Sequence, residues 1–199
     1  MRGLWMGEKV RLRAVRPDDV RLFEKYADDS EIDRLAGDTD FPYDAERDRR
    51  ALEKQIEEDQ EEGDDRFLII ETLEGKYAGT IELLHTDQRH RTADIGVVLD
   101  NRKAWGKGYA GEAIRLLLRF AFRELGYEKV GLSVFEFNPR AIALYEHLGF
   151  QHEGRRRSQV YTDGRRWDEL FMGMTRADYE VQHAVWFPEP PAEAAPAPD

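Results

Sequence analysis

The sequence predicts an α/β domain built on a mainly antiparallel sheet, and three observations carry this prediction. Short runs of alternating apolar and polar residues recur along the chain, as in half-buried strands. Two late runs are joined through Asp163-Gly164, a dipeptide typical of a tight hairpin turn. Between the strand-like runs, residues 109–125 change to a helical period. With 199 residues, of which 41% are hydrophobic, the chain is long enough for one domain with its own core.

The N-terminal part predicts a strand, a helix and a second helix. Residues 10–14 alternate apolar side chains with arginine, which indicates a half-buried strand. Pro17, followed by two aspartates, then favours the start of a helix that continues to about Tyr26. A weakly amphipathic helix is expected over residues 45–62, where Gly63 ends it.

The middle of the chain predicts three consecutive strands. Their expected bounds are residues 66–72, 76–85 and 91–99, and Glu74-Gly75 fits a hairpin turn between the first two. The connections are short, so the three strands are expected to form an antiparallel meander.

The long helix at 109–125 is predicted to have an apolar and a polar face. The expected polar positions are Glu112, Arg115, Arg119 and Arg123. A buried strand is expected at 129–137, and Asn138 with Pro139 then favours a capped helix that runs to Leu148.

Two last strands are expected at about 151–161 and 166–175, forming the hairpin around Asp163-Gly164. Residues 188–199 consist only of Pro, Ala, Glu and Asp, a composition that does not pack into a core. We therefore expect one domain over residues 1–180 and a disordered acidic tail over residues 181–199.

Composition excludes several classes of function. The chain has no cysteine, which removes disulfides, thiolate metal sites and a cysteine nucleophile. The five histidines show no metal-ligand spacing, so no metal is expected. A formal net charge of −11 disfavours nucleic-acid binding. Without an apolar run for a membrane span or an export signal, we expect a cytoplasmic protein that binds no membrane.

Charge is unevenly distributed along the chain. Residues 44–65 carry a local net charge of −7, which either attracts a polycation or belongs to a solvated helix face. Residues 100–125 carry a local net charge of +3 and favour an anionic ligand. The arginines at 155–157 and 165–166 lie on the predicted hairpin, and we interpret them as exposed strand-edge residues.

The turn at residues 105–110, Trp-Gly-Lys-Gly-Tyr-Ala, lies between a predicted strand and the start of the long helix. Two glycines there let an anion approach unpaired backbone N–H groups at the positive end of the helix dipole. Lys103 and Lys107 add positive charge nearby. Residues of this kind in this order suit a phosphate group, although a simple turn would show the same pattern.

Together with the segment 138–150, Asn-Pro-Arg-Ala-Ile-Ala-Leu-Tyr-Glu-His-Leu-Gly-Phe, this turn resembles the GNAT superfamily of acetyl-coenzyme A-dependent N-acetyltransferases. The resemblance covers roughly residues 8–178 and is strongest to the branch of ribosomal-protein N-terminal and spermidine acetyltransferases. It implies a mixed, mostly antiparallel sheet whose central strands splay to admit acetyl-coenzyme A, flanked by helices. Lys103 stands where the family usually has Gln or Arg, and the loop 100–104 is about one residue longer than in close relatives.

The resemblance also implies which residues contact the cofactor. The pyrophosphate is expected on the turn, the pantetheine arm along the strand that precedes it, and Asn138 beside that arm. The expected contacts are Gly96, Val97, Val98, Leu99, Lys103, Trp105, Gly106, Lys107, Gly108, Tyr109, Ala110, Asn138, Arg140 and Ala141.

Tyr145 resembles the family's catalytic tyrosine, which serves the departing thiolate. A phenol near pKa 10 is a weaker acid than a thiol near 8.5, so full proton transfer is uphill by about 2 kcal/mol. Tyr145 is therefore expected to act mostly as a hydrogen-bond donor. Glu82 and Asp94, on strands beside the expected groove, are the candidate bases, and the alternative for each is a solvated strand residue.

The expected function is direct transfer of the acetyl group from acetyl-coenzyme A to a primary amine, since the chain has no cysteine for a covalent intermediate. A small polyamine-like cation is the first expected acceptor, and the N-terminal α-amine of a protein or peptide is the alternative. A catalytically silent coenzyme A-binding module is the hypothesis from another class. Relatives often pair, so a homodimer is also expected.

Overall fold

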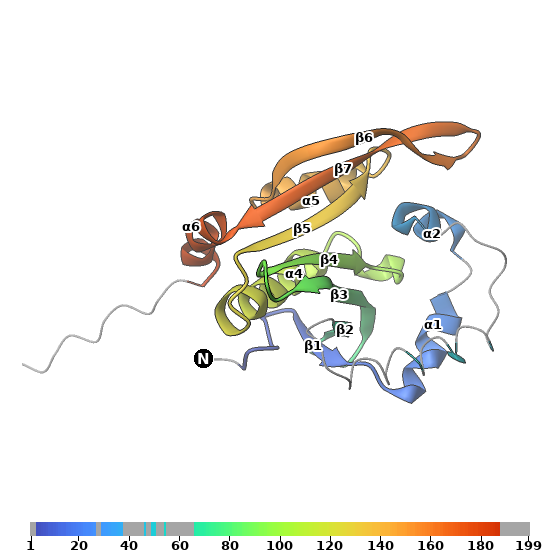
Figure 1. The fold of residues 1–199 in the computed structure, drawn as a ribbon. Helices are drawn as coiled ribbons and strands as arrows, with labels where there is room; N and C mark the ends of the chain where they lie inside the picture. The colour runs from blue at the N-terminus through green and yellow to red at the C-terminus, as the bar shows by residue number, and fades with distance from the viewer. Residues whose placement is uncertain are drawn as a thin grey trace, which may run out of the picture.

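The structure is a computed structural model that describes residues 3–26, 29–37, 46, 49–50, 54 and 66–187. The strands are β1 Val10–Ala14, β2 Arg66–Thr72, β3 Tyr77–Asp87, β4 Thr92–Val98, β5 Lys129–Phe135, β6 Gln151–Thr162 and β7 Arg165–Thr175. They form one seven-stranded sheet in the order β1-β2-β3-β4-β5-β7-β6 (Figure 1). Every neighbouring pair is antiparallel except β4 and β5, so the predicted mixed, mostly antiparallel fold is confirmed.

The helices lie mostly where the sequence predicts them. They are α1 Val20–Tyr26, α2 Ser30–Ala36, α4 Tyr109–Arg119, α5 Pro139–His147 and α6 Arg176–Trp186, with 3-10 turns η1 Pro17–Asp19 and η2 Arg102–Ala104. The last turn of the long helix, Phe120–Glu124, is π-helical. Sequence reasoning missed α2, whose N-cap is Asp29 and whose C-cap is Gly37 with φ of +96°. The helix expected at 45–62 falls almost entirely outside the described residues.

Strands β4 and β5 diverge, and this divergence positions the site. They pair in parallel only where Thr92–Asp94 of β4 lies against Lys129–Gly131 of β5. Beyond these pairs the half of the sheet from β1 to β4 separates from the half made of β5, β7 and β6 (Figure 1). The implied splay of the central strands is thus present.

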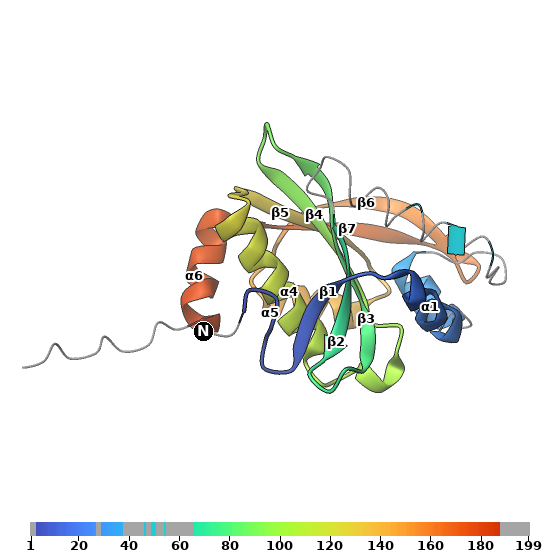
Figure 2. The same cartoon turned by 90° about the horizontal axis from the view of Figure 1, so that it is seen from below.

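Helix α4 packs against one face of the sheet (Figure 2). Its fully buried residues include Ile114, Leu117 and Leu118, which join the core beneath the strands. Glu112, expected on the polar face, is instead buried. Its carboxylate accepts the backbone N–H groups of Glu8 at 2.8 Å and of Lys9 and Val10 at 2.7 Å. Three charge-assisted hydrogen bonds compensate for its burial and fasten the chain before β1 to α4.

Helix α6 runs past the expected domain boundary at residue 180 and ends at Trp186. A capping box between Thr175 and Asp178 starts this helix, and Tyr179 is fully buried against the core. Residues 181–186, expected in the tail, thus belong to a helix that packs on the core. Residues 188–199 lie outside the described residues.

Candidate active site

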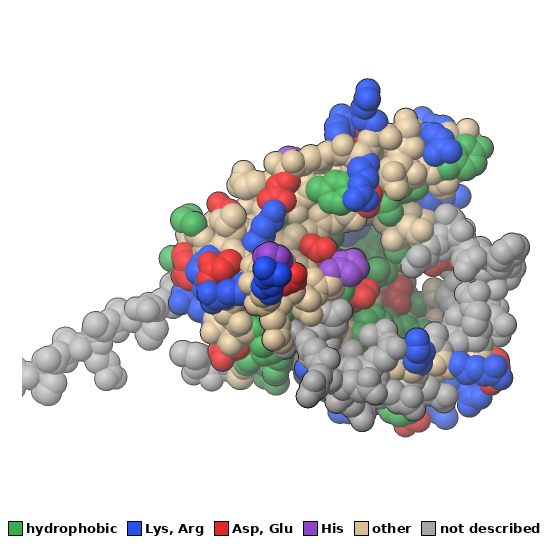
Figure 3. Space-filling model, in the orientation of Figure 1, with side chains coloured by type: hydrophobic (Ala, Val, Ile, Leu, Met, Phe, Trp, Pro, Cys, Tyr) green, Lys and Arg blue, Asp and Glu red, His purple; other side chains and the backbone are tan. Residues whose placement is uncertain are grey.

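A cavity of about 650 Å³ opens where β4 and β5 separate. Its walls come from β4, η2 and the following turn, the start of α4, β5, α5 and α2. The space-filling view shows the surface hollowed on this side of the molecule (Figure 3). Among its lining residues are Glu82, Gly96, Val97, Val98, Leu99, Trp105, Gly106, Gly108, Tyr109, Ala110, Asn138, Arg140, Ala141 and Tyr145, all singled out from the sequence.

The turn before α4 forms one end of this cavity. Gly106 and Gly108 have φ of +74° and +80°, values that glycine adopts without the cost a side chain would bring. A Cβ on Gly106 would meet nothing within 4 Å, so the backbone is open there. The N–H groups of the first turn of α4 therefore point to a space that an anion can enter.

Of the basic residues near this turn, only some are placed as predicted. Lys103 and Lys107 are exposed and do not line the cavity, whereas Arg140 lines it and lies 4.7 Å from the Trp105 ring centroid. Lys9, which sequence reasoning missed, donates from Nζ to the carbonyl of Lys107 at 3.2 Å. The two residues are 98 positions apart, so only the folded chain reveals this contact.

Helix α5 supplies two residues of the opposite wall. The Asn138 side chain caps α5 by accepting the N–H of Ala141 at 3.1 Å. Tyr145 is buried, lines the cavity and packs edge-to-face on Phe150, with ring centroids 5.9 Å apart. Burial raises the pKa of Tyr145 to about 12. The phenol therefore stays protonated at neutral pH and is suited to donate a hydrogen bond.

The two candidate bases are placed differently. Glu82 lies across from Gly96, with Oε1 3.4 Å from the position of a Cβ on that glycine, and it lines the cavity. Asp94 does not line the cavity. Its carboxylate lies 3.1 Å from Nδ1 of His85 and fills the space above Gly131. The structure thus brings Glu82 together with Tyr145 and leaves Asp94 outside.

A second set of lining residues was missed from the sequence. Glu31, Ile32 and Leu35 come from α2, and Phe135 and Phe137 follow from β5. The two phenylalanine rings stack with centroids 5.3 Å apart. The signal for α2 was present in Asp29 and Gly37, the cap residues of a short helix. This wall is mostly apolar and carries one carboxylate.

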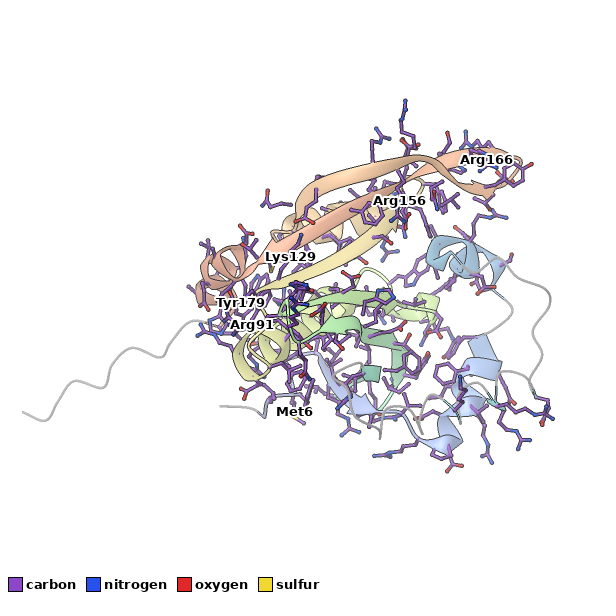
Figure 4. The ribbon with its side chains drawn as sticks, viewed as in Figure 1. Met6, Arg91, Lys129, Arg156, Arg166 and Tyr179 are labelled. Atoms are coloured by element: carbon purple, nitrogen blue, oxygen red, sulfur yellow. The ribbon has the colours of Figure 1, made fainter. Side chains whose placement is uncertain are left out.

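The arginine-rich hairpin lies apart from the cavity. Figure 4 shows Arg156 and Arg166 along β6 and β7. Arg155 pairs with Glu136 and Asp168, and Arg156 lies over the Phe171 ring at 4.6 Å from its centroid. These partners agree with the interpretation of exposed strand residues.

Comparison with known proteins places the chain in a family. Residues 9–151 match the family model described as an acetyltransferase (GNAT) domain. The chain belongs to the GNAT acetyltransferase family. It is 37% identical over 180 residues, 90% of this chain and 97% of the other, to the SPbeta prophage-derived N-acetyltransferase YokL of Bacillus subtilis.

Other GNAT relatives act on polyamines. Spermidine N(1)-acetyltransferase of Vibrio cholerae is 27% identical over 175 residues, 87% of this chain and 97% of the other. The crystal structure of spermidine N-acetyltransferase from Vibrio cholerae in complex with CoA and spermine superposes with a TM-score of 0.76 at 25% identity, covering 87% and 99% of the two chains. The activity of the family is N-acetyl transfer, and acetyl-coenzyme A is the implied donor.

The residues of this GNAT domain fit coenzyme A. The open backbone at Gly106 suits a phosphate, and the part of β4 that leaves β5 presents unpaired backbone beside the cavity to an extended arm. Among the described residues, no group of three or more His, Asp or Glu side chains is arranged to hold a metal. Nor is any helix in that part of the chain long and apolar enough to cross a membrane.

Proposed function

We propose that this protein acetylates a primary amine inside the cavity between β4 and β5, with acetyl-coenzyme A as the donor. The observation that carries the proposal is the convergence of the α4 turn, Tyr145 and Glu82 on one cavity. The amine nitrogen attacks the thioester carbon, the carbon–sulfur bond breaks, and the proton of the amine leaves to a base.

Tyr145 is the hydrogen-bond donor to the departing sulfur in this proposal. With its pKa raised to about 12, full proton transfer to a thiolate of pKa near 8.5 is uphill by about 5 kcal/mol. A donated hydrogen bond stabilises the developing negative charge without that cost. The fixed position of the buried ring on α5 supports this role.

Glu82 is the proposed base, acting directly or through a water molecule. The need for a base depends on the acceptor: an alkyl amine near pKa 10.4 costs over about 4 kcal/mol to deprotonate at pH 7, whereas an α-amine near 7.8 costs about 1 kcal/mol. A carboxylate in the cavity also attracts the protonated amine before it reacts.

A polyamine-like cation is the first proposed acceptor, supported by the spermidine acetyltransferases among the relatives and by Glu31 and Glu82 in the cavity wall. The α-amine of a protein or peptide is the second. Ile32, Leu35 and Phe135 favour it, because an apolar first side chain would pack against them.

A thiol-release assay across polyamines, amino sugars and short peptides tests the proposal. Release of coenzyme A that depends on an amine, with product mass increased by one acetyl group, is the expected result. A clear preference for peptides would make the α-amine of a protein or peptide the acceptor in place of a polyamine. Absence of amine-dependent release across the panel would contradict acetyl transfer to a primary amine.

A further inference from the structure

Helix α2 forms one wall of the cavity, on the side proposed for the acceptor. It lies at the open end between the two halves of the sheet (Figure 1). Ile32 is its buried residue, and Gly37 at its C-terminal end meets the Phe135 ring. Contacts with neighbouring elements therefore set the position of this wall.

One of these contacts comes from the cofactor side. Arg102 lies in η2, directly before the glycine turn. Its Nε and Nη2 donate to the two carboxylate oxygens of Asp29 at 2.5 and 2.7 Å. Nη2 also donates to Glu31 at 2.7 Å. The hydrogen bonds from Arg102 lower the pKa of Asp29, which keeps this N-cap residue charged.

The same arginine contacts the turn. Its guanidinium lies 5.1 Å from the centroid of the Trp105 ring, and Trp105 Nε1 donates to the carbonyl of Leu99 at 2.6 Å. Leu99 and Trp105 both line the cavity where the cofactor is proposed to bind. Arg102 thus connects two walls that come from distant parts of the sequence.

We propose that Arg102 is a positioning residue that couples coenzyme A binding at the turn to the placement of α2. This inference rests on the proposed cofactor site. When the cofactor orders the turn, the fork of Arg102 holds Asp29 and Glu31, and α2 is fixed as the acceptor wall. An exposed ion pair contributes little to global stability. Removing Arg102 is therefore expected to change the coupling between the two walls and not the stability of the fold.

Hydrogen exchange measured by mass spectrometry, with coenzyme A as the probe, tests this coupling. In the unmodified protein, coenzyme A is expected to slow exchange at residues 105–111 and at residues 30–36. In Arg102→Ala, coenzyme A should still protect residues 105–111 from exchange. Its protection of residues 30–36 should fall at least fivefold. Asp29→Ser should lose part of the protection at 30–36, because serine keeps the helix cap but removes the carboxylate that accepts two of the three hydrogen bonds from Arg102 to α2 and its cap.

Arg123→Ala is the matched control, since Arg123 forms an exposed ion pair with Glu180 at 2.5 Å away from the cavity. It should retain protection of both segments. Equal protection of residues 30–36 in Arg102→Ala and the unmodified protein would overturn the coupling. Protection of residues 105–111 without protection of residues 30–36 in the unmodified protein would overturn the coupling as well. Absence of protection at 105–111 in the unmodified protein would instead remove the cofactor site itself, and the coupling with it.

Discussion

At the scale of single residues, two carboxylates with similar sequence settings acquire different surroundings. Both Glu82 and Asp94 lie on predicted strands beside the expected groove, and the sequence offers no way to choose between them. The choice depends on cross-strand register, which places Glu82 opposite Gly96 and Asp94 beside His85 and Gly131. Because glycine has no side chain, the Glu82 carboxylate can extend over the strand into the cavity.

Glu82→Gln is predicted to lower kcat with an alkyl amine by at least about a hundredfold, the low end of what a general base contributes. The loss of kcat in Glu82→Gln should become smaller as the pH rises, because more of the amine is already neutral. Asp94→Asn should stay within about twofold of the unmodified protein, since Asp94 does not line the cavity. Thiol release at several pH values measures both, and equal losses in the two variants would contradict the assignment of Glu82.

At the scale of elements, the strands and most helices were predictable because their signals are local. Alternation, helical period and glycine turns all lie within a few residues of the element that they define. Helix α2 has only seven residues, too few for a period to stand out. Glu112 was misplaced because its partners are the backbone N–H groups of residues more than 100 positions away. The cavity wall that joins α2 to Phe135 and Phe137 was missed because tertiary packing brings these two segments together.

The glycine turn before α4 gives a prediction at this scale. Gly106→Ala places a side chain at φ of +74° and in the space proposed for the phosphate, and it should raise the Kd for coenzyme A at least about tenfold. Gly164→Ala is the control, because Gly164 has φ of +75° and open space around it, but lies in the β6–β7 hairpin. Titration calorimetry should show an unchanged Kd for the control. Similar Kd values in both variants would place the cofactor elsewhere.

At the scale of the whole molecule, buried charges make stability depend on pH in two opposite ways. Burial raises the pKa of Asp19 and Glu71, but hydrogen bonds and charges of neighbouring arginines together outweigh it, Arg13 and Arg16 at Asp19 and Arg13 and Arg11 at Glu71. The net pKa of each carboxyl group therefore lies below its ordinary value. Their contribution to stability is present above the unfolded pKa and is lost as the pH falls through the folded pKa. Asp100 behaves oppositely. Burial raises its pKa to about 6 despite the hydrogen bond from Tyr77 at 2.6 Å.

Asp100→Asn is therefore predicted to gain stability relative to the unmodified protein as the pH rises. The folded protein holds the proton of Asp100 more tightly than the unfolded chain, so ionising this group near neutral pH opposes folding. A pKa of about 6 against 3.8 in the unfolded chain makes this cost about 3 kcal/mol at pH 7 and below about 1 kcal/mol at pH 4.

Urea unfolding of Asp100→Asn at pH 7 and pH 4 measures this change. The gain in free energy of unfolding of the variant over the unmodified protein should be about 2 kcal/mol larger at pH 7 than at pH 4. Asp18→Asn, at an exposed aspartate in η1, should show no such dependence. A difference for Asp100→Asn that is constant between the two pH values would contradict the assigned burial of its charge.

The most direct measurement of the central claim compares Tyr145→Phe with the unmodified protein, using one amine that the panel identifies. The phenylalanine ring fills the same buried space beside Phe150 but cannot donate to the departing sulfur. We predict a Kd for coenzyme A within about twofold and a kcat lowered by at least about a hundredfold, as expected for loss of a positioned acid or hydrogen-bond donor. An unchanged kcat with intact cofactor binding would contradict acetyl transfer through Tyr145 in this cavity.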